Sequence, residues 1–284
     1  MEYFHVDVFS NEILSGNGLT VVFCNEELED DLMLKLTQEF KQFETIFVRR
    51  IVDCIFSARI FTVNEELYFA GHPILGAAAT IHSHIFGNEE DIAITFQLNQ
   101  KTIIVNSKKS AEYYEVQMNQ GKAEFLCEVS KEKRNEYVHA LNLSEENLSE
   151  EFPMEVVSTG LPYLLVPITS GIENTKILIS NFEEMLREVG AKFAYIFDVN
   201  TIEGRTWDNQ GNVEDVATGS AAGPLGAYLY KHNMFNVGHE IIINQGSFVG
   251  RPSKIRVSMS NSEKDILVSG AVAILAKGAI VAKL

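Results

Sequence analysis

The sequence is poor in cysteine, and its three cysteines are scattered along the chain. No two of them form a Cys-x-x-Cys pair. An odd number of isolated cysteines is typical of reduced thiols and argues against a disulfide framework. We therefore interpret Cys24, Cys54 and Cys127 as reduced residues of the core.

Basic residues are also few. Lys and Arg number 23 against 39 Asp and Glu, which gives a formal net charge of -16. Because proteins that bind nucleic acid need clustered basic side chains and no basic run is present, we expect no nucleic-acid partner. The first residues show no basic region followed by an apolar stretch, so no secretory signal is predicted and we expect a cytoplasmic protein. Gly and Lys interrupt the apolar residues 267–284, which favours buried strands over a membrane anchor.

Metal-binding motifs are missing as well. The seven histidines are dispersed, and His82 and His84 form the only close pair. No His-Glu-x-x-His motif or carboxylate cluster accompanies them. The sequence therefore predicts no metal site.

Two glycine-rich segments, residues 69–78 and 217–226, are the most informative features that are present. Each follows an extended stretch and leads into a run of Ala, Gly and Leu, so we expect helices over about 74–85 and 220–231. The backbone N–H groups at a helix start favour an anion. Two such starts predict a protein that holds a small acid.

The surroundings of the two segments indicate an internal duplication. Arg59 lies twelve residues before Gly71, and Arg205 lies fourteen before Gly219. Strand-like sequence dominates the rest of the chain, so each half is predicted to wrap a sheet around one small-residue helix. We expect two lobes, 1–118 and 119–284, with the last strand placed in the second lobe or returned to the first.

Polar residues beside the two helix starts are the candidates for chemistry. His72 lies in the first turn of one predicted helix, and Asp215 and Ser220 flank the start of the other. Each also has an ordinary structural interpretation. His72 and Ser220 are suited to capping a helix, and Asp215 complements the helix dipole.

Six segments in collinear order resemble the phenazine-biosynthesis PhzF-like family. Residues 71–78 and 214–225 are similar to its two signature segments. The other matching segments are 6–9 with 16–17, 43–48, 158–162 and 245–253. Several collinear motifs are far more specific than one glycine-rich turn.

The resemblance implies a fold and an activity. The fold is α+β and diaminopimelate-epimerase-like, with two pseudo-symmetric lobes, each a curved, mostly antiparallel sheet or barrel around a central helix, and an active site in the cleft between them. The activity is that of an isomerase which moves a proton within a small carboxylic acid without cofactor or metal. Family members commonly form homodimers, so a homodimer is expected here.

The same resemblance implies roles for individual residues. Glu44 matches the glutamate that serves as general acid and base, and its neighbours Phe43, Ile46 and Phe47 are expected to shield it from water. The remaining residues are His72 and Asp215 as a supporting catalytic pair, and Gly71, Gly219 and Ser220 as groups that bind substrate oxygens.

Departures from the family pattern leave the substrate open. The unusual residues are Gly18, Phe43, Val216 and 207–209. Phe43 and Trp207 are expected to reshape the cleft. No cysteine lies at either helix start, which disfavours a two-thiol racemase. The alternatives to an isomerase are a non-catalytic protein that binds small anions and an epimerase or racemase of the same fold.

Overall fold

A computed structural model describes residues 1–99, 101–260, 262 and 264–282. The chain divides into two compact units. Unit 1 comprises Met1–Asn119 and Ser269–Leu284, and unit 2 comprises Gln120–Val268. Two strands carry the chain from one unit to the other: β8 (Tyr113–Gly121) and β16 (Ile266–Ala279).

The sheet of unit 1 has the strand order β1-β2-β3-β4-β6-β7-β8. The β2–β3 and β4–β6 pairs are parallel, and the other neighbours are antiparallel. The last strand, β16, pairs with β1, and the short β5 pairs with β4. The bounds are β1 (Glu2–Val8), β2 (Asn17–Phe23), β3 (Glu44–Val52), β4 (Ile55–Thr62), β5 (Glu66–Leu67), β6 (Asp91–Gln97) and β7 (Thr102–Lys109), with helices α1 (Asp30–Phe40) and α2 (Gly71–Ile85).

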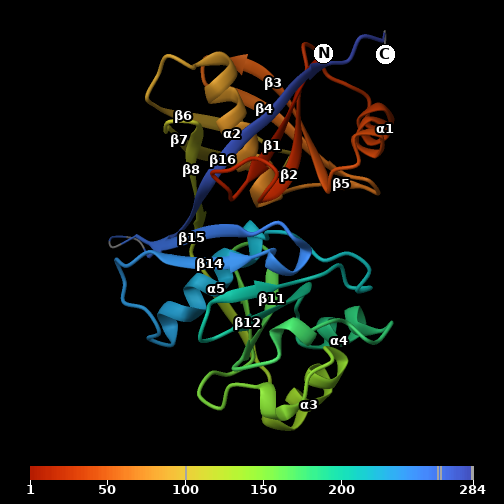
Figure 1. Ribbon diagram of the computed structural model, residues 1–284, viewed down its shortest axis with the longest axis vertical. Coiled ribbons are helices and arrows are strands. Elements are labelled where there is room, and N and C mark those ends of the chain that lie inside the picture. The colour runs from red at the N-terminus through yellow and green to blue at the C-terminus, as the bar shows by residue number, and fades with distance from the viewer. Residues whose placement is uncertain (100, 261, 263, 283–284) are drawn as a thin grey trace. The chain divides into compact units, whose positions relative to one another are not determined.

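Helix α2 is the centre of unit 1 and packs against β1, β2, β3, β6 and β7 (Figure 1). Every residue from Gly71 to His82 is buried. Small side chains permit this enclosure because the strands approach the helix backbone closely. A Cβ on Gly76 would lie 2.4 Å from Leu19 Cδ2 and 2.9 Å from Val8 Cγ2.

Unit 2 repeats the plan around a second helix. Its sheet has the order β15-β14-β13-β12-β11-β10-β9, in which β11–β12 and β13–β14 are parallel. The bounds are β9 (Glu124–Glu128), β10 (Glu155–Ser158), β11 (Pro162–Ile168), β12 (Phe193–Asp198), β13 (Glu203–Arg205), β14 (Ile241–Gln245) and β15 (Ser253–Met259), with helices α3 (Lys131–Ala140), α4 (Phe182–Glu188) and α5 (Gly219–Lys231).

Helix α5 packs against β10, β11 and β15 and is buried along almost its whole length. A Cβ on Gly226 would lie 2.3 Å from Val257 Cγ1, so a small residue is required here as it is in α2. Helices α3 and α4 contribute to a second hydrophobic core in unit 2, and its buried residues include Tyr137, Phe182 and Leu186.

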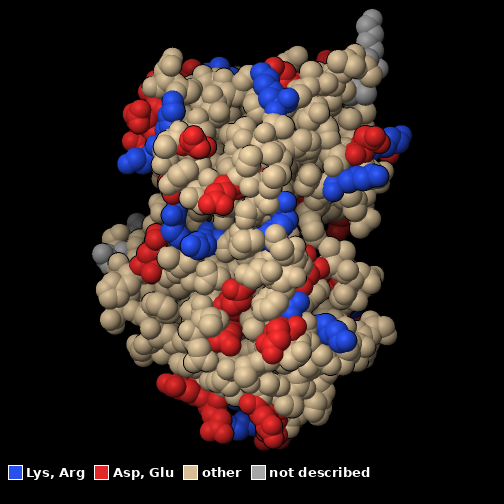
Figure 2. All heavy atoms as spheres, in the orientation of Figure 1, with Lys and Arg blue, Asp and Glu red and all other residues tan. Residues whose placement is uncertain are grey.

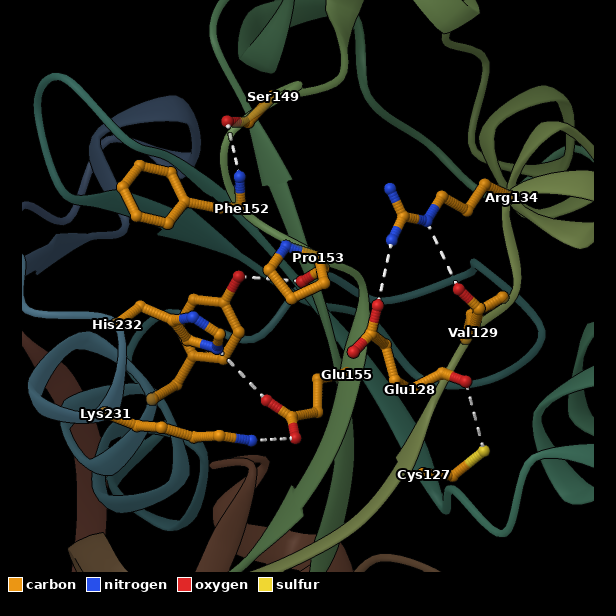
Figure 3. Close-up of polar contacts among 11 residues, drawn as sticks. Cys127, Glu128, Val129, Arg134, Ser149, Phe152, Pro153, Glu155, Lys231 and His232 are labelled. Carbon is orange, nitrogen blue, oxygen red and sulfur yellow. Dashed lines mark hydrogen bonds and ion pairs between the residues drawn. The ribbon is translucent and has the colours of Figure 1, made fainter.

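The C-terminal end of α5 is fixed by polar contacts with β10 and with Pro153, two residues before that strand (Figure 3). Glu155 is only 5% exposed, and its carboxylate contacts both the Lys231 ammonium group and the His232 ring. The Tyr228 hydroxyl donates to the carbonyl of Pro153 at 2.7 Å. Cations near a helix C-terminus complement its dipole, so this cluster anchors α5 at the end opposite its glycine-rich start.

The structure agrees with the α+β class and with one central helix in each half. The two helices begin at Gly71 and Gly219, earlier than the predicted starts at 74 and 220. Helix α1 was not predicted; most of its side chains are polar, and in the structure only Met33 and Thr37 are buried. The face shown in Figure 2 carries acidic and basic side chains interspersed among uncharged ones.

The cysteines lie at the margins of the cores rather than inside them. All three are free and half-buried. Cys24 packs against a cluster that includes Val22, Met33 and Phe47. Burial raises the pKa of the Cys24 thiol to about 11, because a thiolate is poorly solvated there.

Replacing Gly226 with Val tests the close packing of α5. The new side chain would overlap Val257, and overpacking of a core costs typically about 1–3 kcal/mol. We expect a lower unfolding midpoint in urea, followed by tryptophan fluorescence. Ser83→Ala, on the less enclosed part of α2, is the control. A Gly226→Val midpoint equal to the wild type would contradict the packing described.

Alkylation of Cys24 by iodoacetamide is expected to be slow at pH 8. With a pKa of about 11, only about one thiol in a thousand is ionised there, and only the thiolate reacts. The rate should rise about tenfold per pH unit between pH 8 and 10. Mass spectrometry of the peptide that contains Cys24 measures this rate. A plateau above pH 9 would show that the thiol has an ordinary pKa.

Candidate active site

Glu44 and His72 meet in unit 1. Glu44 is the first residue of β3, and His72 is the second residue of α2. Because α2 packs against β3, the start of the helix comes close to the start of the strand. Glu44 Oε2 lies 3.1 Å from His72 Nε2, and the side chains are only 14% and 6% exposed. Two titratable groups are therefore within reach of proton sharing in a largely dry environment.

The carboxylate of Glu44 keeps capacity to accept a proton. Its Oε2 atom is buried, and no protein donor in the described part of the chain is aligned on it as a hydrogen bond. The contact with His72 is short but lacks that alignment. Of the neighbours expected to shield Glu44, Ile46 and Phe47 are buried, whereas Phe43 is 38% exposed. Because side chains alternate along a strand, Ile46 shares a face of β3 with Glu44 and Phe47 lies on the opposite face. The shielding thus comes from the Ile46 side and not from Phe43.

The capping interpretation is wrong for both helix starts. Ala70 occupies the N-cap position of α2, and Thr218 occupies that of α5. His72 and Ser220 are each the second residue of their helix, so neither is the N-cap residue. Neither Ala70 nor Thr218 makes a side-chain capping hydrogen bond. Side-chain capping is the usual way to satisfy first-turn N–H groups. The N-cap residues of both helices lack it, which is compatible with an anion at a helix start.

Asp215 and Ser220 lie beside the start of α5 in unit 2. Asp215 Oδ2 accepts a hydrogen bond of 2.5 Å from the hydroxyl of Thr218. Ser220 Oγ lies 2.8 Å from the hydroxyl of Tyr163. Gln120 Nε2 donates to the carbonyl of Gly219 at 2.9 Å. The polar groups at this helix start are therefore held by partners from several segments.

The predicted site residues thus fall into two sets. Unit 1 contains Glu44, Gly71 and His72, and unit 2 contains Asp215, Gly219 and Ser220. Sequence reasoning did not single out the residues that hold the second set, which are Gln120, Tyr163, Thr218 and Gln245. Gln245 begins the motif 245–253, and Tyr163 directly follows the motif 158–162. These two motifs are the only sequence features that point to Tyr163 and Gln245.

Each helix start is preceded by the same ion pair. Arg59 Nε and Nη2 donate to the two oxygens of Glu66 at 2.7 and 2.6 Å. Arg205 makes the same bidentate contact with Glu214 at 2.8 and 2.7 Å. The guanidinium groups also lie over Phe61 and Trp207, at 5.3 and 4.7 Å from the ring centroids. Arg59 and Arg205 are the residues that the duplication pairs, and their matching contacts support it.

Two other expectations from the sequence concern a metal site and a membrane-spanning segment. Within the described residues no group of three His, Cys, Asp or Glu is arranged to hold a metal ion, and no helix is long and apolar enough to span a membrane. His82 is instead bonded to Ser107 and to the carbonyl of Glu89, and His84 pairs with Glu2.

Comparison with known proteins assigns the chain to a family. The family model described as "phenazine biosynthesis-like protein" matches residues 6–278. A trans-2,3-dihydro-3-hydroxyanthranilate isomerase of Pseudomonas chlororaphis is 30% identical over 88% of this chain and 87% of its own length. A solved structure described as a predicted epimerase from Pseudomonas aeruginosa is 40% identical, with a TM-score of 0.93 and 99% of each chain covered.

A solved structure with much lower sequence identity has the same fold. A probable proline racemase from Agrobacterium radiobacter is 11% identical, with a TM-score of 0.64 over 99% of this chain and 93% of that chain. These matches confirm the fold class and the predicted class of enzyme, an isomerase. The chain belongs to the phenazine biosynthesis-like protein family.

The two arginine–glutamate ion pairs allow a matched test of how much each one stabilises the fold beside a helix start. Arg205 is 9% exposed and also donates to the carbonyl of Ile172, whereas Arg59 is 21% exposed. Lysine cannot reproduce the planar fork of bidentate contacts. We expect Arg205→Lys to lower the free energy of unfolding by about 2–4 kcal/mol and Arg59→Lys by about half as much. Urea unfolding measures both, and equal losses would contradict the difference in burial.

Proposed function

We propose that the protein is a cofactor-independent isomerase that moves a proton within a small carboxylic acid, with Glu44 as general acid and base. The observation that supports this most is the contact between Glu44 Oε2 and His72 Nε2, 3.1 Å apart and buried. A protein that merely bound an anion would gain nothing from a second carboxylate at the same place, because like charges repel.

The proposed reaction has two proton transfers. The Glu44 carboxylate removes a proton from one carbon of the substrate, and the electron pair moves into the adjacent unsaturated system. The protonated Glu44, part of which exchanges its proton with water between the two steps, then gives a proton to a second carbon, so the number of protons is unchanged. His72 lies within reach of Oε2 and stabilises whichever charge state Glu44 adopts between the two steps.

Charge that develops on the substrate needs donors fixed in advance. The proposed donors are the backbone N–H groups of Gly71 and Gly219 together with the hydroxyl of Ser220. Tyr163, whose hydroxyl lies 2.8 Å from Ser220 Oγ, limits the rotation of that group. We further propose that Asp215 supports the proton transfer.

The class of substrate follows from the relatives and from one exposed side chain. The relative from Pseudomonas chlororaphis is named for trans-2,3-dihydro-3-hydroxyanthranilate, an unsaturated cyclic acid, and we propose an acid of this kind here. Phe43 lies next to Glu44 and is 38% exposed, so it is available to contact a ring. Trp207 is 8% exposed and packs in the core of unit 2, which makes it a poor candidate for substrate contact.

Epimerisation is the second candidate. The 40% identical structure is described as a predicted epimerase, and inversion at one carbon also begins with removal of a proton. A two-thiol mechanism does not suit this chain, because the N-cap positions hold Ala70 and Thr218. Product analysis separates the two reactions, since an isomerase moves a double bond and an epimerase changes only configuration.

Hydrogen exchange in deuterated water tests the role of Glu44. The protein is incubated with trans-2,3-dihydro-3-hydroxyanthranilate and related unsaturated acids, and mass spectrometry follows deuterium entry. We expect exchange with the wild type and at least about a hundredfold slower exchange with Glu44→Gln, because general acid–base catalysis contributes about 10²–10⁴-fold.

The control for this experiment is Glu90→Gln, which neutralises an exposed carboxylate of the same unit. It should exchange at the rate of the wild type. Equal exchange in wild type and Glu44→Gln would exclude Glu44 as the base. Binding of an acid without exchange would favour an anion-binding protein.

A further inference from the structure

A buried amide lies beneath the turn that carries Asp215. Gln245, the last residue of β14, is 0% exposed. Its Oε1 accepts hydrogen bonds from the Tyr195 hydroxyl at 2.9 Å and from the Thr218 backbone N–H at 3.0 Å. Its Nε2 donates to the Asp215 carbonyl at 2.9 Å and to Thr218 Oγ1 at 3.0 Å. Two donors on its oxygen and two acceptors on its nitrogen fill the capacity of the amide.

The backbone fixes the direction of this network. A backbone N–H can only donate and a carbonyl can only accept, so Gln245 has one possible orientation. Thr218 Oγ1 therefore accepts a hydrogen bond from Gln245 Nε2 and donates one to Asp215 Oδ2. The Asp215 oxygen that receives this hydrogen bond therefore acts as an acceptor.

Thr218 behaves unusually for its position. It is the N-cap residue of α5, where a threonine hydroxyl ordinarily accepts from a first-turn N–H. Here it makes no such bond and points to Asp215 instead. The helix thereby forgoes a capping interaction, and the carboxylate gains a fixed donor.

We propose that Thr218 and Gln245 are positioning residues that hold the Asp215 carboxylate in one orientation, as a hydrogen-bond acceptor, for the reaction. This inference rests on the proposed function, in which Asp215 supports proton transfer. Neither residue needs to touch the substrate. Gln245 orients Thr218, and Thr218 orients Asp215, so both act through the geometry of a third side chain.

The kinetic test uses isosteric and conservative replacements of one residue. Thr218→Val removes the hydroxyl and keeps the shape, whereas Thr218→Ser keeps the hydroxyl. With the acid that the wild type exchanges, we expect Thr218→Val to lower kcat at least tenfold while KM changes less than about threefold. Thr218→Ser should stay within about threefold of the wild type. Each variant is assayed well below its own unfolding midpoint.

Thr175→Val is the matched control. Thr175 is also buried in unit 2, at 2% exposure, and its hydroxyl donates to the carbonyl of Gly171 away from Asp215. It should keep the wild-type kcat and KM. An equal loss of kcat in Thr175→Val and Thr218→Val, or no loss in Thr218→Val, would overturn the proposal.

A structural measurement keeps the test independent of activity. Crystal structures of the wild type, Thr218→Ser and Thr218→Val are compared at Asp215. We expect the carboxylate to keep its orientation in Thr218→Ser and to rotate in Thr218→Val. An unchanged carboxylate in Thr218→Val would overturn the positioning role. If the wild type exchanges no acid, the proposed function fails, and the crystal structures still decide this inference.

Discussion

Enclosure of a helix by the strands of its own unit is the constraint on which the rest of the structure depends. Strands surround α2 closely enough that a Cβ on Gly76 would overlap Leu19, and α5 meets the same limit at Gly226 and Val257. At these two contact points only glycine fits without displacing a neighbouring side chain. Because the helix cannot move outward, its first turn is held against the strands, and β3 brings Glu44 to within 3.1 Å of His72.

The same enclosure explains why the helix starts are chemically useful. A helix buried along its length presents its N-terminal N–H groups from a fixed position, and neither N-cap side chain covers them. Arginine–glutamate pairs brace the strands that precede both starts. The two helix starts are thus preceded by the same kind of ion pair but carry different polar residues. One has His72 beside Glu44, and the other has Ser220 and the Asp215 network.

The sequence predicted the features that depend on local composition. The glycine and alanine runs indicated the two central helices, and collinear motifs indicated the family, which the comparisons confirm. Helix α1 was missed although its acidic first turn, Asp30 and Asp31, is a local helix signal, because no glycine-rich or family motif marks it. The Gln245 network was missed because its contacts join residues 27 and 50 positions apart, and such contacts exist only after the sheet has formed.

The central claim is that one carboxylate, Glu44, both takes and returns the proton. A single-turnover experiment in ordinary water tests it most directly, with an acid deuterated at the carbon that loses the proton. The account predicts that part of the deuterium appears on the carbon that gains the proton, because it remains on Glu44 between the two steps. Complete loss of deuterium to water, together with turnover by Glu44→Gln, would contradict it.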